Sequence, residues 1–362
     1  MSNLDEARKS INEIDKQMAP LFEARMDAVG RIADYKREHG LSVEDSAREQ
    51  KLRESNCKLI RNDDYKSYYV SFQNAVMDIS KSYQHRLLDG MRIAFSGAKG
   101  AFADITAAKI FPDGEQIGFR DFKAAYDSVA RGECDSVVLP LENSVGGDVG
   151  TVMDLCFFGT LFVNGIYETE IIQNLIAIKG TSIGDIKTVV SHPQALSQCS
   201  EYIRKNGFET MESVNTAVAA KYVSESKRGD LAAIGSAFAA KEFGLSILES
   251  HINESGSNTT RFAVLSRAAK APDKNDDRFI LLFTVKNIAG ALGKAVSIIG
   301  EHGFNLRALK SRPTKELVWN YYFYAEGEGN INSDKGKKML SSLKNYCLDI
   351  KVLGSFEKEI RI

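Results

Sequence analysis

The sequence predicts a multidomain protein with three segments of different fold class: an all-α segment over 1–90, a two-lobed α/β segment over 91–268 and a βαββαβ unit over 278–355. Three observations support this division. Apolar residues near the N-terminus recur at helical spacing, short β-rich runs alternate with helical patterns from residue 91 onward, and a charged stretch, KAPDKNDDR at 270–278, precedes a second alternating set.

The first segment begins with a seam of mostly apolar residues spaced alternately by three and four positions, which predicts one long helix. Further helices are expected near 44–61 and 65–88. Because three helices with one very long member bury little surface within a single chain, we expect an entwined dimer. The seam residues are Leu4, Ala7, Ile11, Ile14, Met18, Leu21, Arg25, Ala28, Ile32 and Tyr35.

The second segment alternates strands with helices, as α/β proteins do. Strands are expected at 91–95, 136–140, 161–167, 174–178 and 188–191, and helices at 121–131, 192–205 and 215–226. The span is long enough for two lobes with a cleft between them.

The third segment has the order of a split-βαβ, ferredoxin-like unit. The expected elements are a strand at 279–285, a helix at 290–301, strands near 304–311 and 317–325, a helix at 333–344 and a strand at 349–355.

The composition points to a cytoplasmic protein. A net charge of -1 gives no reason to expect binding to nucleic acid or to an anionic membrane. The five cysteines show no C-x-x-C pairing, which argues against a zinc site or a disulfide framework. The polar start MSNLDEARKS does not resemble a signal peptide, and no apolar run approaches the ~18 residues of a membrane span.

Arg25 breaks the apolar seam, and a buried cation needs an anionic partner. Further polar residues share helix faces at spacings of three and four, which favours a common site. Surface salt bridges remain an alternative interpretation for most of them taken singly. The residues are Lys36, Asp45, Arg48, Glu49, Ser80 and Gln84.

With Arg8, this set resembles the active site of all-helical chorismate mutases. The resemblance implies that Arg8 crosses into the partner's site, that Arg8 and Arg25 bind substrate carboxylates, and that Lys36 and Gln84 contact the ether oxygen. Glu49, with Asp45 or Arg48, would fix the substrate hydroxyl, and Ser80 would be a further contact. Rearrangement of chorismate to prephenate is pericyclic, so no metal or cofactor is implied.

Three motifs in the second segment lie at predicted strand ends, where α/β folds place ligands. They are LPLENSVGG (139–147), SHPQALSQC (191–199) and NTTRF (258–262). Taken singly, each has a structural interpretation: a turn for the Asn-Ser loop, a helix cap for His192 before Pro193, and a turn before a strand for NTTRF.

Together the three motifs resemble prephenate dehydratases, whose fold is a two-lobed, periplasmic-binding-protein-like α/β domain. The resemblance implies that Thr260 assists departure of the substrate hydroxyl and that Glu142, Ser191 and Gln198 line the same cleft. It also implies substrate contacts for Asn143, Ser144 and Arg261. Prephenate would lose carbon dioxide and water to give phenylpyruvate.

In the third segment, AGAL (289–292) and SRP (311–313) resemble the effector loops of ACT regulatory domains. The alternative is a dimerising ferredoxin-like domain without ligand. Lys310 departs from the family, in which glutamate is usual. The resemblance implies L-phenylalanine binding by Gly290, Ala291, Leu292, Ser311, Arg312 and Pro313.

The order of the three segments predicts a bifunctional chorismate mutase–prephenate dehydratase of phenylalanine biosynthesis. We expect feedback regulation by L-phenylalanine and a homodimer or higher homo-oligomer. Two alternatives remain: a dehydratase with an inactive, mutase-like dimerisation domain, and a ligand-sensing regulator. Arg25 in the seam argues against the first, and the lack of a basic recognition helix argues against a regulator that binds DNA.

Overall fold

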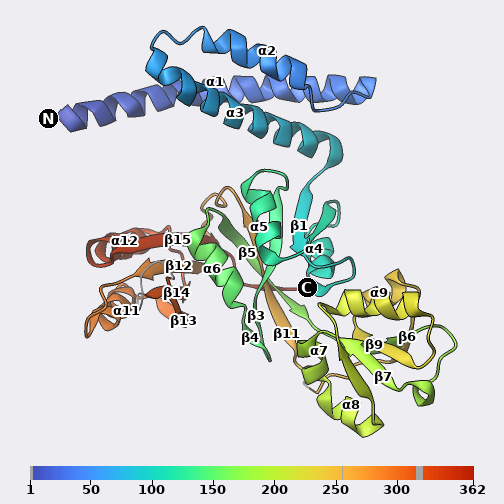
Figure 1. The fold of residues 1–362 in the computed structure, drawn as a ribbon. Coiled ribbons are helices and arrows are strands. Elements are labelled where there is room, and N and C mark those ends of the chain that lie inside the picture. Colours follow the sequence, from blue (N-terminus) through green and yellow to red (C-terminus); the bar gives the residue numbers. More distant parts are fainter. Residues whose placement is uncertain (1–2, 255, 315–320) are drawn as a thin grey trace. The chain divides into compact units, whose positions relative to one another are not determined.

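The computed structural model describes residues 3–254, 256–314 and 321–362 (Figure 1). The chain forms two compact units, residues 1–92 and 93–362, which are described separately. Within the described ranges, no helix is both long and apolar enough to cross a membrane.

The first unit consists of the three predicted helices, α1 (Asn3–His39), α2 (Ser46–Cys57) and α3 (Asp63–Asp89). The side chain of Asp45 caps α2 by accepting a hydrogen bond from the amide of Arg48, and Asn62 caps α3 in the same manner. Only Val29 and Ala33 are buried among the residues of α1. The large seam residues Leu4, Ile11, Ile14, Met18, Leu21, Ile32 and Tyr35 are all exposed in the single chain.

The first lobe of the second unit is built on a seven-stranded sheet of order β16-β5-β11-β3-β1-β2, with β4 paired to β3. Strands β3 and β11 are neighbours in this sheet and run antiparallel. The elements are β1 (Arg92–Ser96), α4 (Phe102–Ile110), β2 (Glu115–Phe119), α5 (Phe122–Ala130), β3 (Ser136–Asn143), β4 (Gly147–Asp148), α6 (Gly150–Phe158), β5 (Phe162–Glu170), β11 (Thr259–Ser266) and β16 (Ile360–Arg361).

The second lobe is a five-stranded sheet of order β10-β6-β9-β7-β8 with its own helices. The chain enters this lobe after β5 and returns to the first lobe at β11, so the two lobes are joined by two crossings. The elements are β6 (Asn174–Ala177), a 3₁₀ turn (Ile183–Asp185), β7 (Thr188–Ser191), α7 (Pro193–Gln198), α8 (Ser200–Asn206), β8 (Glu209–Glu212), α9 (Thr216–Ser226), β9 (Leu231–Gly235), α10 (Ala237–Glu242) and β10 (Ser246–Glu249).

The single helix expected over 192–205 is two helices, because the chain leaves helical geometry at Cys199 (φ -120°, ψ 19°). Burial of Cys199 in the second-lobe core holds this corner in place.

The third segment has the predicted βαββαβ order: β12 (Arg278–Thr284), α11 (Ala291–Glu301), β13 (Asn305–Pro313), β14 (Tyr321–Glu328), α12 (Asp334–Tyr346) and β15 (Asp349–Phe356). Its sheet order, β13-β14-β12-β15, is that of a ferredoxin-like fold. The part of the expected strand at 317–320 lies outside the described residues.

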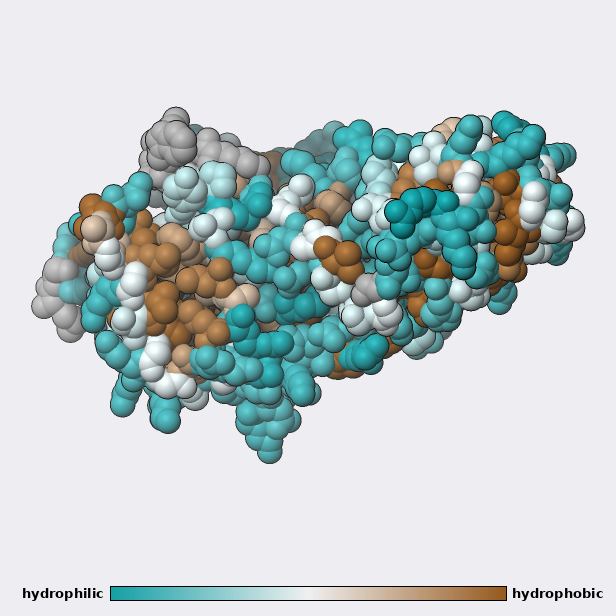
Figure 2. Space-filling view, turned by 90° about the horizontal axis from the view of Figure 1, so that it is seen from below, coloured by the Kyte–Doolittle hydropathy of each residue, from teal (hydrophilic) through white to brown (hydrophobic). Residues whose placement is uncertain are grey.

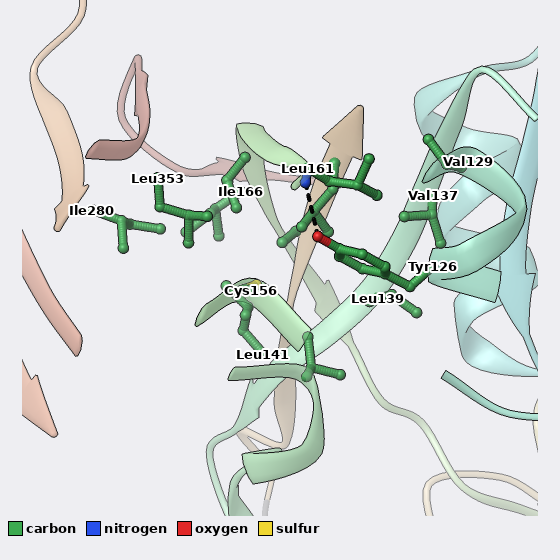
Figure 3. Packing of buried hydrophobic residues seen from close by; sticks show 14 of the residues in the cluster. Tyr126, Val129, Val137, Leu139, Leu141, Cys156, Leu161, Ile166, Ile280 and Leu353 are labelled. Carbon is green, nitrogen blue, oxygen red and sulfur yellow. Dashed lines mark hydrogen bonds between the residues drawn. The ribbon is translucent and has the colours of Figure 1, made fainter. Parts of the chain in front are cut away.

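This segment is not separate from the first lobe, because the two share one hydrophobic core. Figure 3 shows Ile280 and Leu353 of the third segment beside Ile166 of β5, with the Tyr126 hydroxyl accepting a hydrogen bond from the amide of Leu161. The chain then returns to the first lobe, where β16 pairs in parallel with β5. On the face seen in Figure 2, hydrophobic residues form patches within a mostly hydrophilic surface.

Candidate active sites

A cavity of about 650 Å³ is lined by both lobes of the second unit. The first lobe supplies Asn143 and Thr260 from neighbouring strands, and the second lobe supplies His192 and Gln198 from around α7. Three of the sequence motifs, far apart along the chain, therefore meet at one cavity, as the sequence predicts.

Thr260 lies on β11 directly opposite Asn143 on β3. The amide nitrogen Nδ2 of Asn143 donates to the Thr260 Oγ1 at 2.9 Å. Because the threonine oxygen is the acceptor in this hydrogen bond, the Thr260 hydroxyl hydrogen is left to donate elsewhere. Thr260 is 7% exposed and lines the cavity, so a substrate there is a natural acceptor.

The orientation of the Asn143 amide is set by its surroundings. Its Oδ1 accepts hydrogen bonds from the backbone amides of Val145 and Gly146, at 3.1 and 2.7 Å, so the NH₂ group must face Thr260. Gln198 donates to the same oxygen at 3.4 Å and accepts from Asn258 at 3.0 Å. This polar network spans both lobes.

Two predicted cleft residues point away from the cavity. Successive side chains on a strand face opposite sides of the sheet, so Glu142 and Arg261 face away where Asn143 and Thr260 face in. Arg261 donates to Glu142 at 3.0 Å and to Glu326 of β14 at 2.7 Å. Neither Glu142 nor Arg261 is among the residues that line the cavity, in contrast to the placement that the resemblance implies.

Two serines are also placed differently from the prediction. Ser191 is fully buried at the end of β7, where its hydroxyl donates to the carbonyl of Ile234 at 2.7 Å, so it does not line the cavity. Ser144 does not line it either. Its hydroxyl donates to the carbonyl of Ser257 and accepts from the Thr259 amide, which ties the β3–β4 turn to the start of β11.

His192 has the capping role that its position before Pro193 suggested, because its Nδ1 accepts from the amide of Gln194 at 3.2 Å. Sequence reasoning did not select several polar residues in or beside the cavity, among them Asn258 and Gln173. Asn258 joins Asn143 to Gln198, and the buried Gln173 lines the cavity with an Oε1 that has no hydrogen-bond partner within the described residues. The sequence signal for Asn258 was its polar character within NTTRF, and no sequence signal pointed to Gln173.

In the first unit, Arg25 and Ser80 are brought together as predicted, with the guanidinium donating to the Ser80 hydroxyl. No carboxylate in the described part of the unit forms an ion pair with Arg25. Partial burial lowers the pKa of Arg25. Beside it is an apolar cavity of about 660 Å³ lined by residues such as Met18, Phe22 and Met77. A half-buried cation without an acidic partner suits an anionic ligand.

The remaining predicted residues of this unit have varied surroundings. Gln84 is buried, and its Oε1 has no hydrogen-bond partner within the described residues. Lys36 donates to the carbonyl of Val43 at 2.7 Å. Glu49 pairs at 3.5 Å with Lys81, a residue that the sequence reasoning did not select. Asp45 serves as the cap of α2, and Arg8 and Arg48 are exposed.

The two predicted effector loops differ in how their residues are used. Gly290, which precedes Ala291 and Leu292, adopts a left-handed backbone (φ 78°) at the start of α11, which favours glycine. Arg312 binds Asp154 of α6 with two hydrogen bonds of 2.7 and 3.1 Å, so its guanidinium contacts the first lobe. Its neighbours Ser311 and Pro313 are exposed.

Comparison with known proteins agrees with this division. The family model for chorismate mutase type II matches residues 7–85, and that for prephenate dehydratase matches residues 93–270. A bifunctional chorismate mutase/prephenate dehydratase from Buchnera aphidicola (Acyrthosiphon pisum) is 30% identical, with 97% of this chain and 96% of the relative covered. Arogenate dehydratase 2 from Petunia hybrida is 31% identical, covering 74% and 72%.

Among solved structures, prephenate dehydratase from Arthrobacter aurescens in complex with L-Phe is 25% identical with a TM-score of 0.69, covering 74% of this chain and 90% of that chain. The similarity to the Buchnera enzyme extends over nearly the full length of both chains, and the two family models match in the same order, which establishes the family. The chain belongs to the bifunctional chorismate mutase/prephenate dehydratases, enzymes that combine an isomerase and a lyase in one polypeptide.

Proposed function

We propose that the dehydratase reaction takes place in the cavity between the lobes, with Thr260 as the hydrogen-bond donor to the leaving hydroxyl. The observation that carries this is the hydrogen bond from Asn143 Nδ2 to Thr260 Oγ1, which leaves the threonine hydrogen available to the cavity. Asn143, Asn258 and Gln198 hold the hydroxyl in this orientation.

The reaction balances without a cofactor. The bond to the departing carboxylate breaks, its electron pair enters the ring, and the bond to the ring hydroxyl breaks at the opposite carbon. The leaving oxygen takes up a proton and departs as water, so prephenate and one proton give phenylpyruvate, carbon dioxide and water. Thr260 stabilises negative charge on that oxygen while the solvent supplies the net proton, because a threonine hydroxyl is too weak an acid to supply it.

The first unit is proposed to catalyse the chorismate rearrangement as an entwined dimer, with Arg25 bound to a substrate carboxylate. The lack of a carboxylate partner for Arg25 in the described part of the unit supports this role. The exposed apolar seam of α1 supports a dimer, because burying it against a second copy would remove a large apolar area from water. Arg8 is exposed on the same helix and would reach the partner's site.

Residues 1–90 form the proposed mutase domain, 91–268 the dehydratase domain and 278–355 an ACT domain that binds L-phenylalanine as an allosteric inhibitor. The relative solved with L-Phe and the ferredoxin-like topology support this assignment. The backbone at Gly290 suits an effector carboxylate near the start of α11. We place the enzyme in the cytoplasm, because its five cysteines are free thiols, as is usual in a reducing compartment.

One assay tests these proposals: purified protein is given chorismate, and phenylpyruvate is measured with and without L-phenylalanine. Production of phenylpyruvate with inhibition by L-phenylalanine is expected. Turnover of supplied prephenate but not of chorismate would mean that the helical domain is inactive, and no turnover of either would favour a sensor. Arogenate, with an ammonium in place of the keto group, is the matched comparison. Among the described lining residues, the carboxylate that could pair with this ammonium is Asp148, and Asp148 already pairs with Lys310.

A further inference from the structure

Strand β13 of the third segment presents two cations to the first lobe. Lys310 and Arg312 are two residues apart and so lie on the same face of the strand. Arg312 binds Asp154 of α6, and Lys310 donates to Asp148 of β4 at 2.5 Å and to Glu142 of β3 at 3.1 Å. Residues 142–148 are here called the catalytic hairpin. Glu142 and Asp148 belong to this hairpin, and Asp154 follows it in the sequence.

The two carboxylates bound by Lys310 face each other across this hairpin. Glu142 on β3 pairs directly with Asp148 on β4, and the next pair toward the turn is Asn143 with Gly147. Like charges directly opposite on neighbouring strands destabilise their pairing. Lys310 places a positive charge between them, and its side chain is only 17% exposed, so solvent screens this interaction incompletely.

The ion cluster also affects the ionisation of its members. Burial of the Lys310 ammonium lowers its pKa, but the hydrogen bonds with Asp148 and Glu142 outweigh burial and leave the pKa raised. Burial raises the pKa of Glu142, but Lys310 and Arg261 together leave it lowered. The Lys310 ammonium and the Glu142 carboxylate are therefore both charged near neutral pH.

The hairpin in turn holds the Thr260 hydroxyl. The Asn143 side chain accepts from two amides of the hairpin turn and donates to Thr260, so a change in the hairpin moves the donor that orients the hydroxyl. The structure assigns Lys310 as a positioning residue of the dehydratase: from the third segment, it holds the Glu142–Asp148 pair together and thereby fixes Asn143 against Thr260.

Lys310 also lies next to Ser311, at the start of the proposed effector loop. A shift of β13 on effector binding would reach the hairpin through the Lys310 side chain. The inference rests on the proposed dehydratase mechanism. The hairpin clamp, meaning the hydrogen bonds from Lys310 to Glu142 and Asp148, has a readout that does not depend on activity.

The test is a double-mutant cycle between Lys310→Met and Asp148→Asn in the full-length enzyme, with prephenate as substrate. In the natural background, Lys310→Met should lower kcat about tenfold, within the range of coupling between contacting charged residues. In the Asp148→Asn background the same substitution should lower kcat less than about threefold. Glu142 then has no like charge opposite it and keeps its ion pair with Arg261. Lys310→Arg, which preserves the charge, should retain most of the kcat.

Hydrogen exchange of the 142–148 peptide supplies the independent readout. It should be faster in Lys310→Met than in the unmodified chain, and unchanged in the matched control Lys344→Met, which removes an exposed lysine from α12. An equal cost of Lys310→Met in both backgrounds, or unchanged exchange in the hairpin, would overturn the proposal. Faster exchange in a chain that does not turn over prephenate would support the clamp and refute the proposed reaction instead.

Discussion

Replacing Thr260 by alanine is the most direct test of the dehydratase site. The substitution removes a donor but little volume from a position that is 7% exposed. Asn143 loses one acceptor and keeps two, the Asn258 side chain at 2.8 Å and the Thr259 carbonyl at 3.1 Å. The amide therefore stays hydrogen-bonded, and we expect the free energy of unfolding to fall by only about 1 kcal/mol.

The catalytic cost should be much larger than the structural one. A positioned donor to a leaving group contributes roughly 10²–10⁴ in rate, which corresponds to about 2.7–5.4 kcal/mol in the activation free energy. Because the substitution removes only the donor to the leaving hydroxyl, the loss should appear in kcat and leave KM for prephenate nearly unaffected.

Both activities should be measured in both single variants, Thr260→Ala and Arg25→Ala. Thr260→Ala should retain chorismate turnover, because Arg25 and Thr260 belong to different compact units, and Arg25→Ala should retain turnover of supplied prephenate. Thr260→Ser keeps the donor and should restore substantial dehydratase activity. A Thr260→Ala enzyme that forms phenylpyruvate at the natural rate would refute the mechanism and leave NTTRF as a turn before a strand.

Four further predictions concern the helical unit and the effector loop. Gln84→Glu should make mutase activity fall between about pH 5 and 8, because a carboxyl group must be protonated to donate to the ether oxygen and burial would raise its pKa above ~4.3; a pH–rate profile matching that of the natural enzyme would contradict this. Burial lowers the pKa of His85, but hydrogen bonds to Asp89 and Glu44 leave it above its usual 6.5. These bonds stabilise the unit fully below that value and progressively less as pH rises through the raised pKa. The free energy of urea unfolding should therefore change less between pH 6 and pH 8 in His85→Gln than in the natural chain. Leu21→Glu should halve the mass measured by light scattering and abolish chorismate turnover, since Leu21 is 70% exposed in a single chain; an intact dimer would exclude the seam as the interface. Gly290→Ala should raise the inhibition constant for L-phenylalanine several-fold, because a side chain at φ 78° costs about 1 kcal/mol; unchanged inhibition would place the effector elsewhere.

Local patterns were sufficient for the order and type of most elements. Heptad spacing predicted the long helix α1, which spans Asn3–His39, and alternation of strands and helices predicted two kinds of α/β segment. The same local reasoning placed Thr260 at the mouth of a strand, because turn-forming residues precede an apolar run there. It could not place the break at Cys199, since a buried corner in a helical pattern has no local signal.

The tertiary structure alone decided which side chains meet. Asn143 and Thr260 are neighbours because β3 and β11 pair antiparallel in a register that a sequence separation of 117 residues does not specify. That register also sends Glu142 and Arg261 to the opposite face, because side chains alternate along a strand. The role proposed for Lys310 depends on the contact of β13 with the hairpin. Contacts between distant segments depend on how whole elements pack, and no local pattern encodes them.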